Sequence, residues 1–356
     1  WRCWLNPAMG GAEVFTREVL KRWADQGHQI VLFTSQFKGS KREENIDGVK
    51  IIRAGGSYMV YRQAKKFYKN RFAKEKYDVI IDEINTRPFH TPSFAKNGEK
   101  IVALIHQLAK EYWFYETPFP ISFLGYYFLE SEWLKPYQRF PTVTVSDSTR
   151  RDLTELGFEK TFVVGEGLNF APLSQLSEKE KHPSLVYAGR LKKAKRPEHA
   201  IKAFRIIKET IPDAELWMIG DGYLRKKLAK MACEGVKFFP SLSNEERRRL
   251  IARSWVLVNP SVREGFGLNI IEANALGVPC IAYDVPGLRD AIINGETGFI
   301  VEPGNPKALA DCVLNILNND ALRIELSKKA LLQSSKFSWD DVADRFGKII
   351  KYYHTL

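Results

Sequence analysis

The chain has 356 residues, of which 44% are hydrophobic and 27% are charged, a composition that excludes a disordered or fibrous protein and fits about two globular domains. It contains no run of about 18 apolar residues, so the sequence predicts no transmembrane helix. The 54 Lys and Arg against 42 Asp and Glu give a net charge of +12, which indicates an anionic partner such as a phosphate, a nucleic acid or an acidic membrane surface. A basic surface without a specific partner is an equally good interpretation.

The first half of the chain alternates short apolar runs with amphipathic stretches. Because the apolar runs carry no polar face, they predict a parallel sheet that helices cover on both sides. A helix is expected over 12–26, and strands are expected at 27–34 (after a turn), 49–53, 77–82, 100–105 and 142–145.

The same alternation restarts after a linker at 170–183, which is rich in charge and has Pro near both ends. Helices are expected at 197–209 and 221–234, and strands at 184–188, 214–219, 236–239, 255–259, 279–283 and 298–301. Ligands of such sheets bind beyond the carboxyl ends of the strands. The sequence therefore predicts two Rossmann-like α/β domains, with a ligand in the cleft between them.

Three loops that follow predicted strands are candidates for a binding site. The first contains Gly10 and Gly11 and opens a helix, so that its backbone amides can approach a phosphate or a sugar closely. Glu13 falls in the first turn of that helix, where a carboxylate suits the helix dipole. A plain structural turn is an equally good interpretation of this motif by itself.

The second loop spans 188–197 and separates a strand from a helix. Its Arg190 and Lys195 lie five positions apart, so a guanidinium and an ammonium can converge on one diphosphate. The alternative is a solvated basic loop, because Lys192, Lys193 and Arg196 are expected to be exposed.

The third loop, 260–272, is rich in glycine and carries two carboxylates eight positions apart, Glu264 in the loop and Glu272 in the following helix. The amides at the start of that helix form an anion site, and they belong to Gly265, Phe266, Gly267 and Leu268. Two carboxylates would repel a bare diphosphate but can accept hydrogen bonds from the hydroxyls of a sugar and a ribose. A capped helix with one surface Glu is the alternative.

Several other classes of site are not supported. The chain has no G-x-G-x-x-G after a strand, no P-loop, no Ser elbow, and no Asp-x-Asp that could clamp a divalent metal. Its four cysteines form no C-x-x-C pair, which fits a reducing, cytoplasmic setting. The chain starts at Trp1, where the first expected strand is incomplete, so the sequence leaves open whether an N-terminal segment is missing.

Taken together, the motifs resemble the retaining glycosyltransferases of family 4, which have the GT-B fold. The resemblance covers nearly the whole chain. It rests on GGAE (10–13), GH (27–28), IHQ (105–107), VSDST (145–149), AGRL…K (188–195), IGDG (219–222), the E-x7-E signature (264–272) and LGVPCIAYDVPGLRDAI…GETGFIVEPGN (276–305).

The resemblance implies specific roles in binding a nucleotide-sugar donor. Arg190 and Lys195 would bind the diphosphate, Glu272 the ribose and Glu264 the sugar, with amides at 265–268 completing the site. The Gly10–Gly11 loop would cap the donor, and His106 would lie near the reacting sugar, with a core histidine as its alternative. The base would lie near 239–243, including Leu242, largely against backbone.

The family chemistry implies sugar transfer with retention at the anomeric carbon, without a metal or another cofactor. The implied domains are an acceptor-binding domain (1–169), a donor-binding domain (170–335) and a final helix (336–356) that returns to the first domain. The chain departs from the family at Pro286–Gly287, where Gly-Gly is frequent, and at Glu166–Asn169. The donor is left as GDP-mannose or UDP-glucose, in that order. A nucleotide-sugar epimerase or a phosphorylase on the same fold is an alternative.

Aromatic and basic residues in the first domain suggest the kind of acceptor. The segment 60–76 predicts a basic amphipathic helix with Tyr61, Tyr68 and Phe72 on its apolar face, and 112–128 holds nine aromatic residues. Core packing is one interpretation, and the boundary of an anionic bilayer is the other. The prediction is a peripheral membrane enzyme with a lipid-linked or polysaccharide acceptor. The rival is a non-enzymatic basic module on a membrane or a nucleic acid, but such a module does not account for the E-x7-E loop.

Overall fold

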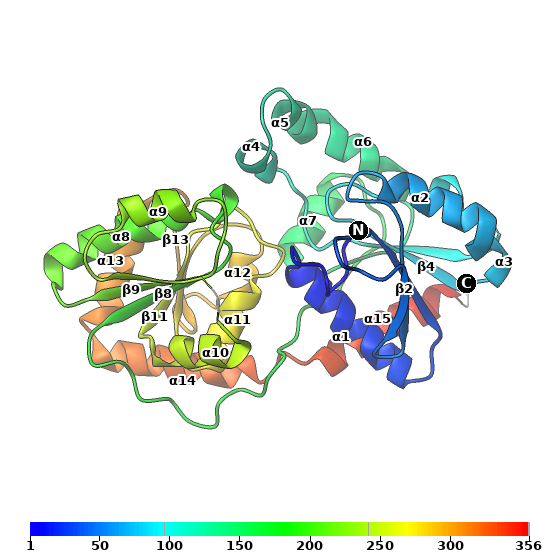
Figure 1. The fold of residues 1–356 in the computed structure, drawn as a ribbon. Helices are drawn as coiled ribbons and strands as arrows, with labels where there is room; N and C mark the ends of the chain where they lie inside the picture. The colour runs from blue at the N-terminus through cyan, green and yellow to red at the C-terminus, as the bar shows by residue number, and fades with distance from the viewer. Residues whose placement is uncertain (96, 241, 355–356) are drawn as a thin grey trace. The chain divides into compact units, whose positions relative to one another are not determined.

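The computed structural model describes residues 1–95, 97–240 and 242–354, and the contacts divide the chain into two compact units (Figure 1). Unit 1 comprises Trp1–Lys110, Phe123–Gly167 and Ser338–Leu356, and unit 2 comprises Glu111–Ser122 and Leu168–Phe337. The sequence did not predict that the short segment Glu111–Ser122 clusters with the second half of the chain. None of the described helices is both long enough and apolar enough to cross a membrane.

Unit 1 contains two sheets where the sequence predicted one. The strand orders are β1-β3-β2 and β4-β5-β6-β7, and all neighbours are parallel except β2 and β3. Strands β1 and β4 belong to different sheets. Residues of both strands, among them Leu32 and Ile80, line a cavity of about 180 Å³. The strands are β1 Ile30–Thr34, β2 Glu43–Ile46, β3 Val49–Arg53, β4 Val79–Glu83, β5 Lys100–Leu104, β6 Thr142–Thr144 and β7 Thr161–Val163.

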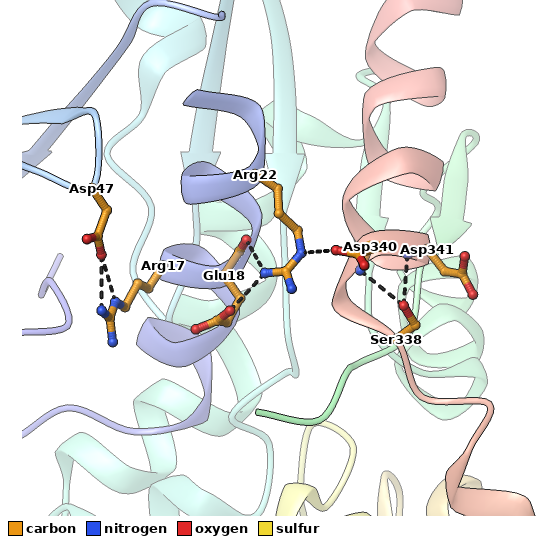
Figure 2. Close-up of polar contacts among 7 residues, drawn as sticks. All are labelled: Arg17, Glu18, Arg22, Asp47, Ser338, Asp340 and Asp341. Atoms are coloured by element: carbon orange, nitrogen blue, oxygen red, sulfur yellow. Dashed lines mark hydrogen bonds and ion pairs between the residues drawn. The ribbon is translucent and has the colours of Figure 1, made fainter. Parts of the chain in front are cut away.

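The helices of unit 1 include one from the very end of the chain. Helix α15 packs against α1, and Figure 2 shows the ion pair that joins Arg22 of α1 to Asp340 of α15. Arg22 of α1 donates through Nε to Asp340 at 2.6 Å and through Nη1 to Glu18 at 2.8 Å, and the Trp23 indole donates to the Ala343 carbonyl at 3.0 Å. The predicted return of the final helix is therefore confirmed. The helices are α1 Gly11–Asp25, α2 Val60–Phe67, α3 Ala73–Glu75, α5 Ile121–Leu124, α6 Glu130–Leu134, α7 Asp147–Glu155 and α15 Trp339–His354.

Unit 2 is built on one fully parallel sheet, as predicted, and its strand order is β10-β9-β8-β11-β12-β13. The central strands are apolar on both faces and buried, because helices lie on both sides of the sheet (Figure 1). The strands are β8 Ser184–Ala188, β9 Glu215–Ile219, β10 Val236–Phe239, β11 Val256–Asn259, β12 Cys280–Tyr283 and β13 Gly298–Val301. The helices are α4 Tyr112–Glu116, α8 Pro197–Thr210, α9 Arg225–Met231, α10 Asn244–Arg253, α11 Leu268–Ala275, α12 Leu288–Ala291, α13 Pro306–Leu317 and α14 Asp320–Ser334.

The strand order of unit 2 positions its binding loops. The chain runs outward from β8 through β9 to β10, then returns to pair β11 with β8 and runs outward the other way. The direction of winding thus reverses between β8 and β11, and ligands of open α/β sheets bind at such a switch point. The loops that follow β8 and β11 are the 188–197 and 260–268 loops of the sequence analysis.

Candidate active site

The loop after β8 lies directly on the loop after β9. The Leu191 amide donates to the Asp221 carbonyl at 2.9 Å, and Gly189 donates to Ile219 at 3.0 Å. A Cβ at Gly220 would lie only 2.2 Å from the Gly189 carbonyl oxygen, and Gly220 has φ +126°. The IGDG motif is therefore glycine-rich because the two backbones touch. It also delays helix α9, which begins at Arg225 instead of 221.

Lys195 and Glu264 form the polar centre of unit 2. The Lys195 Nζ donates to the Glu264 carboxylate, whose other oxygen accepts from the Ser261 hydroxyl at 2.8 Å. Their side chains are only 15% and 16% exposed. Burial acts to raise the pKa of Glu264, but the neighbouring Lys195 outweighs burial and holds that pKa below its usual value. Burial acts to lower the pKa of Lys195, yet Glu264 leaves it raised. Both groups are therefore charged at neutral pH.

The other basic residues of this loop divide into exposed and half-buried. Arg190 and Lys193 are exposed, whereas Lys192 and Arg196 are half-buried, contrary to the expectation that both would be exposed. Burial, together with Lys195 and Arg190 nearby, lowers the pKa of Lys192 to about 8. Lys192, Lys195 and Arg190 are thus close enough for their charges to interact, as a diphosphate site would require.

The glycine-rich loop after β11 ends in a helix N-terminus. Gly267 is in the left-handed region with φ +100° and caps α11, which begins at Leu268. Two Asn side chains fix this loop: Asn259 donates to Asn269 at 3.1 Å, and Asn269 donates to the Ala188 carbonyl of β8 at 2.9 Å. Gly265, Phe266, Gly267 and Leu268 therefore lie beside the 188–197 loop, where free amides can bind an anion.

Glu272, in the second turn of α11, already has a partner. Its carboxylate accepts from Arg247 Nη2 of α10 at 2.7 Å, and both side chains are partly exposed. The sequence analysis did not identify Arg247, because nothing in the local sequence of α10 indicates a contact 25 positions away. Leu242 is half-buried against the core of unit 2, and Ser241 of the predicted base-binding stretch lies outside the described residues.

The Pro286–Gly287 departure from the family has a structural role. Glu264 donates its amide to the Pro286 carbonyl at 3.0 Å, and a Cβ at Gly287 would lie 2.2 Å from the Glu264 carbonyl oxygen. Gly287 also has φ +83°, a conformation that side chains rarely adopt. This glycine therefore sets the position of the Glu264 backbone.

We expect Gly287→Ala to lower the free energy of unfolding by roughly 2–4 kcal/mol, because left-handed strain and a backbone clash add together. The matched control is Gly295→Ala: Gly295 has a similar φ of +79° but nothing within 4 Å of its Cβ position. This control should lose only about 1–2 kcal/mol. Urea denaturation of both variants measures the difference, and equal losses would show that the contact with Glu264 has no effect.

The remaining predicted residues belong to unit 1. Gly10 caps α1, and its amide donates to Glu13 Oε2 at 2.6 Å, while Arg2 donates to Glu13 Oε1 at 2.8 Å. Glu13 lies in the first helical turn, as predicted, and is buried. Gly11 is the first residue of the helix. The hydrogen bond from the Gly10 amide to Glu13 accounts for part of the GGAE motif, so the helix start has a structural reason besides any role with a ligand.

His106 follows β5 in unit 1 and is almost fully buried. Its Nε2 lies 3.2 Å from Glu83 Oε1, and its ring packs edge-on against Phe15 of α1 at a centroid distance of 5.0 Å. Burial acts to raise the pKa of Glu83, but the hydrogen bond from His106 leaves it lowered, so Glu83 is ionised. His106 Nδ1 has no hydrogen-bond partner among the described residues. Glu83 thus orients a ring whose second nitrogen is available, and the sequence analysis did not identify Glu83.

Within the described ranges, no group of three or more His, Cys, Asp or Glu side chains has the arrangement of a metal site. The polar residues at the switch point of unit 2 are instead a lysine, two carboxylates and backbone amides. This set can neutralise a diphosphate and bind hydroxyl groups. It does not resemble an oxygen-rich cation site.

Known proteins match this chain over nearly its whole length. A family model described as "Glycosyltransferase Family 4" matches residues 9–171, and one described as "Glycosyl transferases group 1" matches residues 173–333. A curated relative, the D-inositol 3-phosphate glycosyltransferase of a Nocardioides species, is 31% identical over 179 residues. That match covers 45% of this chain and 39% of the relative, so the chain spans about two fifths of the relative's length.

Solved structures show the fold. Sucrose-phosphate synthase from Thermosynechococcus elongatus has a TM-score of 0.81 at 20% identity, over 97% of this chain and 94% of that chain. Anabaena Alr3699/HepE in complex with UDP-glucose has a TM-score of 0.73 at 15% identity, over 99% and 98%. The two family matches and the two Rossmann-like units agree on one assignment: this chain belongs to glycosyltransferase family 4 and has the GT-B fold.

Proposed function

We propose that this glycosyltransferase moves a hexose from a nucleoside-diphosphate sugar with retention at the anomeric carbon and without a metal. The observation that carries the proposal is the charged centre at the switch point of unit 2. There the loop that carries Arg190 and Lys195 is joined to the loop before α11 by the contacts of Lys195 with Glu264 and of Asn269 with Ala188, and Glu272 follows in α11. A non-enzymatic basic module would not need carboxylates among its cations.

The proposed chemistry follows from these charges. As the bond between sugar and diphosphate breaks, negative charge grows on the leaving phosphate and positive charge on the sugar ring. Lys195, Arg190 and the amides of 265–268 stabilise the phosphate, and fixed groups of this kind supply much of an enzyme's rate enhancement. Glu264 and Glu272 accept hydrogen bonds from sugar and ribose hydroxyls. We propose attack on the face that the phosphate leaves, with the phosphate taking the acceptor proton, and we assign no protein base.

The donor is proposed to be UDP-glucose or GDP-mannose. The sequence ranked GDP-mannose first, whereas the complex of Alr3699/HepE with UDP-glucose supports the uridine donor. Thermal shift with UDP, GDP and their hexose conjugates tests this proposal. A rise in melting temperature with one nucleoside diphosphate and its sugar supports it. No shift with any of them would contradict the donor site in unit 2.

Activity is expected to persist in excess EDTA. The diphosphate is proposed to be neutralised by Lys195 and Arg190, whose charges need no metal ion as a bridge. The release of nucleoside diphosphate is measured before and after dialysis against the chelator. Complete loss of turnover that Mg²⁺ or Mn²⁺ restores would contradict the metal-free mechanism.

The acceptor is proposed to be lipid-linked or a polysaccharide, with the enzyme at an anionic membrane surface. Part of the aromatic evidence for this proposal needs correction. Tyr68 is buried and donates to Glu99 Oε1 at 2.6 Å, and Phe72 packs against Phe33 at 5.9 Å, so the apolar face of 60–76 is core. The amphipathic pattern was correct, but the partner of that face is the rest of unit 1.

Another group of apolar residues in unit 1, three of them aromatic, is exposed. Phe123, Leu124, Tyr127 and Phe128 are between 44% and 54% exposed, and the rings of Phe123 and Tyr127 pack together at 4.6 Å. We call these four residues the aromatic patch. Arg87 lies over the rings of Tyr61 in α2 and Trp133 in α6, so both helices contact one side chain. The exposed Lys65 and Lys66 of α2 therefore belong to the same part of unit 1 as the patch.

We expect the protein to sediment with anionic vesicles at low salt and to be released as salt rises, because each lysine near such a surface contributes about 1 kcal/mol. Replacing Lys65, Lys66 and Lys69 with Glu should weaken sedimentation without changing nucleotide affinity. The matched control replaces the exposed Lys226, Lys227 and Lys230 of unit 2 with Glu. Equal loss in both triple variants, or no sedimentation at all, would contradict a membrane surface on unit 1.

A further inference from the structure

A short segment of the first half of the chain, Glu111–Glu116, contacts both donor loops of unit 2. We call this segment the arm. Glu111 accepts from Arg263 Nε at 2.7 Å, and the Arg263 side chain is only 4% exposed. Glu116 accepts from the Ala194 amide at 2.8 Å and from the Tyr223 hydroxyl at 3.1 Å. The arm is thus anchored at both ends, once on the loop after β11 and once on the loop after β8.

Tyr112 lies between these anchors in the sequence, and its ring faces Lys192 and Lys195. The Lys192 ammonium lies 4.6 Å from the centre of its ring, and the Lys195 ammonium lies 5.9 Å from it. The Tyr112 side chain also interacts electrostatically with Lys195. Burial raises the pKa of the Tyr112 hydroxyl, so it stays neutral beside Lys195 and does not cancel the charge of the ammonium.

The contacts of Lys195 leave part of its ammonium group available for a ligand. An ammonium has three N–H groups. Among the described residues, the ammonium donates to the Glu264 carboxylate and lies beside the Tyr112 ring, which leaves N–H groups for an oxygen of a diphosphate. The ring of Tyr112 offsets the repulsion between Lys192 and Lys195, because the face of an aromatic ring attracts cations.

We propose that Tyr112 is a positioning residue of the donor site, which holds Lys192 and Lys195 together for the diphosphate of the donor. This inference rests on the proposed function, because it assumes that Lys195 binds that diphosphate. It adds the arm, contributed by the first half of the chain, to a site otherwise made by the loops after β8 and β11.

The experiment is calorimetric titration of UDP and of GDP, together with steady-state kinetics, on wild type, Tyr112→Phe and Tyr112→Ala. Tyr112→Ala removes the ring and should weaken binding of the nucleoside diphosphate by about tenfold, as expected for a desolvated cation–π contact. Tyr112→Phe keeps the ring and should restore that affinity, while kcat stays reduced because Lys195 has lost the hydroxyl that interacts with it. This separation of affinity from kcat would not arise from a general loosening of the arm.

The matched control is Tyr115, which belongs to the same arm but contacts Arg196 through its hydroxyl and its ring. Tyr115→Ala should leave nucleoside-diphosphate affinity near that of wild type. Equal weakening by Tyr112→Ala and Tyr115→Ala would overturn the proposal, and so would wild-type affinity and kcat in both Tyr112 variants. If wild type itself binds neither UDP nor GDP, the proposed function fails, and the inference falls with it.

Discussion

Lys195→Ala is expected to lower kcat/KM by about 10²–10³-fold, or about 3–4 kcal/mol of transition-state stabilisation. Two effects act in the same direction. The ammonium that we propose to meet the leaving diphosphate is lost, and Glu264 remains buried without the cation that now holds its pKa down. A buried carboxylate without a partner binds a proton more readily, so Glu264 also becomes a poorer acceptor for a sugar hydroxyl.

The control for this variant is Lys193→Ala, because Lys193 belongs to the same short turn but is exposed. Its loss should leave kcat/KM close to the wild-type value. Both variants are followed by the release of nucleoside diphosphate at saturating acceptor. Similar, small effects of the two substitutions would mean that overall positive charge matters and that the buried Lys195 has no special role.

Glu264→Ala and Glu272→Ala are expected to abolish most turnover for different reasons. Glu264 binds Lys195, so its removal frees that ammonium, and a nucleoside diphosphate should bind at least as tightly as in wild type while transfer is lost. Glu272 lies at the other end of the loop with Arg247, and its removal should weaken nucleotide binding by about 1.5–3 kcal/mol, the value of a hydrogen bond to a charged group.

Titration of each variant with the nucleoside diphosphate that wild type binds separates the two roles. Arg247→Ala is a useful companion, because it removes the partner of Glu272 and leaves the carboxylate in place. We expect this variant to bind the nucleotide more weakly than wild type but better than Glu272→Ala. Equal loss of nucleotide binding in the Glu264 and Glu272 variants would contradict the division of roles.

The sequence predicts the parts of this protein that depend on local pattern. The buried strands of unit 2 are continuous apolar runs, and the loops after β8 and β11 carry Arg190, Lys195 and Glu264 within a few positions of those strands. The parallel order of the sheet then brings the two loops together. The charged strand β2 was not predicted, because it has no run of apolar residues. The three-residue strand β7 was not predicted either, although its Phe162 and Val163 begin a short apolar run.

The contacts that the sequence did not predict are long-range ones. Tyr112 is 83 positions from Lys195, and Arg247 is on a helix whose charged pattern matches an ordinary exposed surface. The apolar face of 60–76 shows a further limit of pattern. An amphipathic helix indicates that its apolar face is covered, but not by what. The contact of Tyr68 with Glu99 shows that the core of unit 1, and not a membrane, covers this part of the face.

The central claim is that unit 2 breaks a nucleotide sugar and the enzyme transfers the sugar with retention. The most direct test follows UDP-glucose and GDP-mannose by phosphorus and proton NMR in the presence of the protein and a lipid-linked or glycan acceptor. We predict that free nucleoside diphosphate accumulates and that the transferred sugar keeps the anomeric configuration it had in the donor. An intact nucleotide whose sugar has changed configuration at a ring carbon would identify an epimerase, and it would contradict the transfer mechanism.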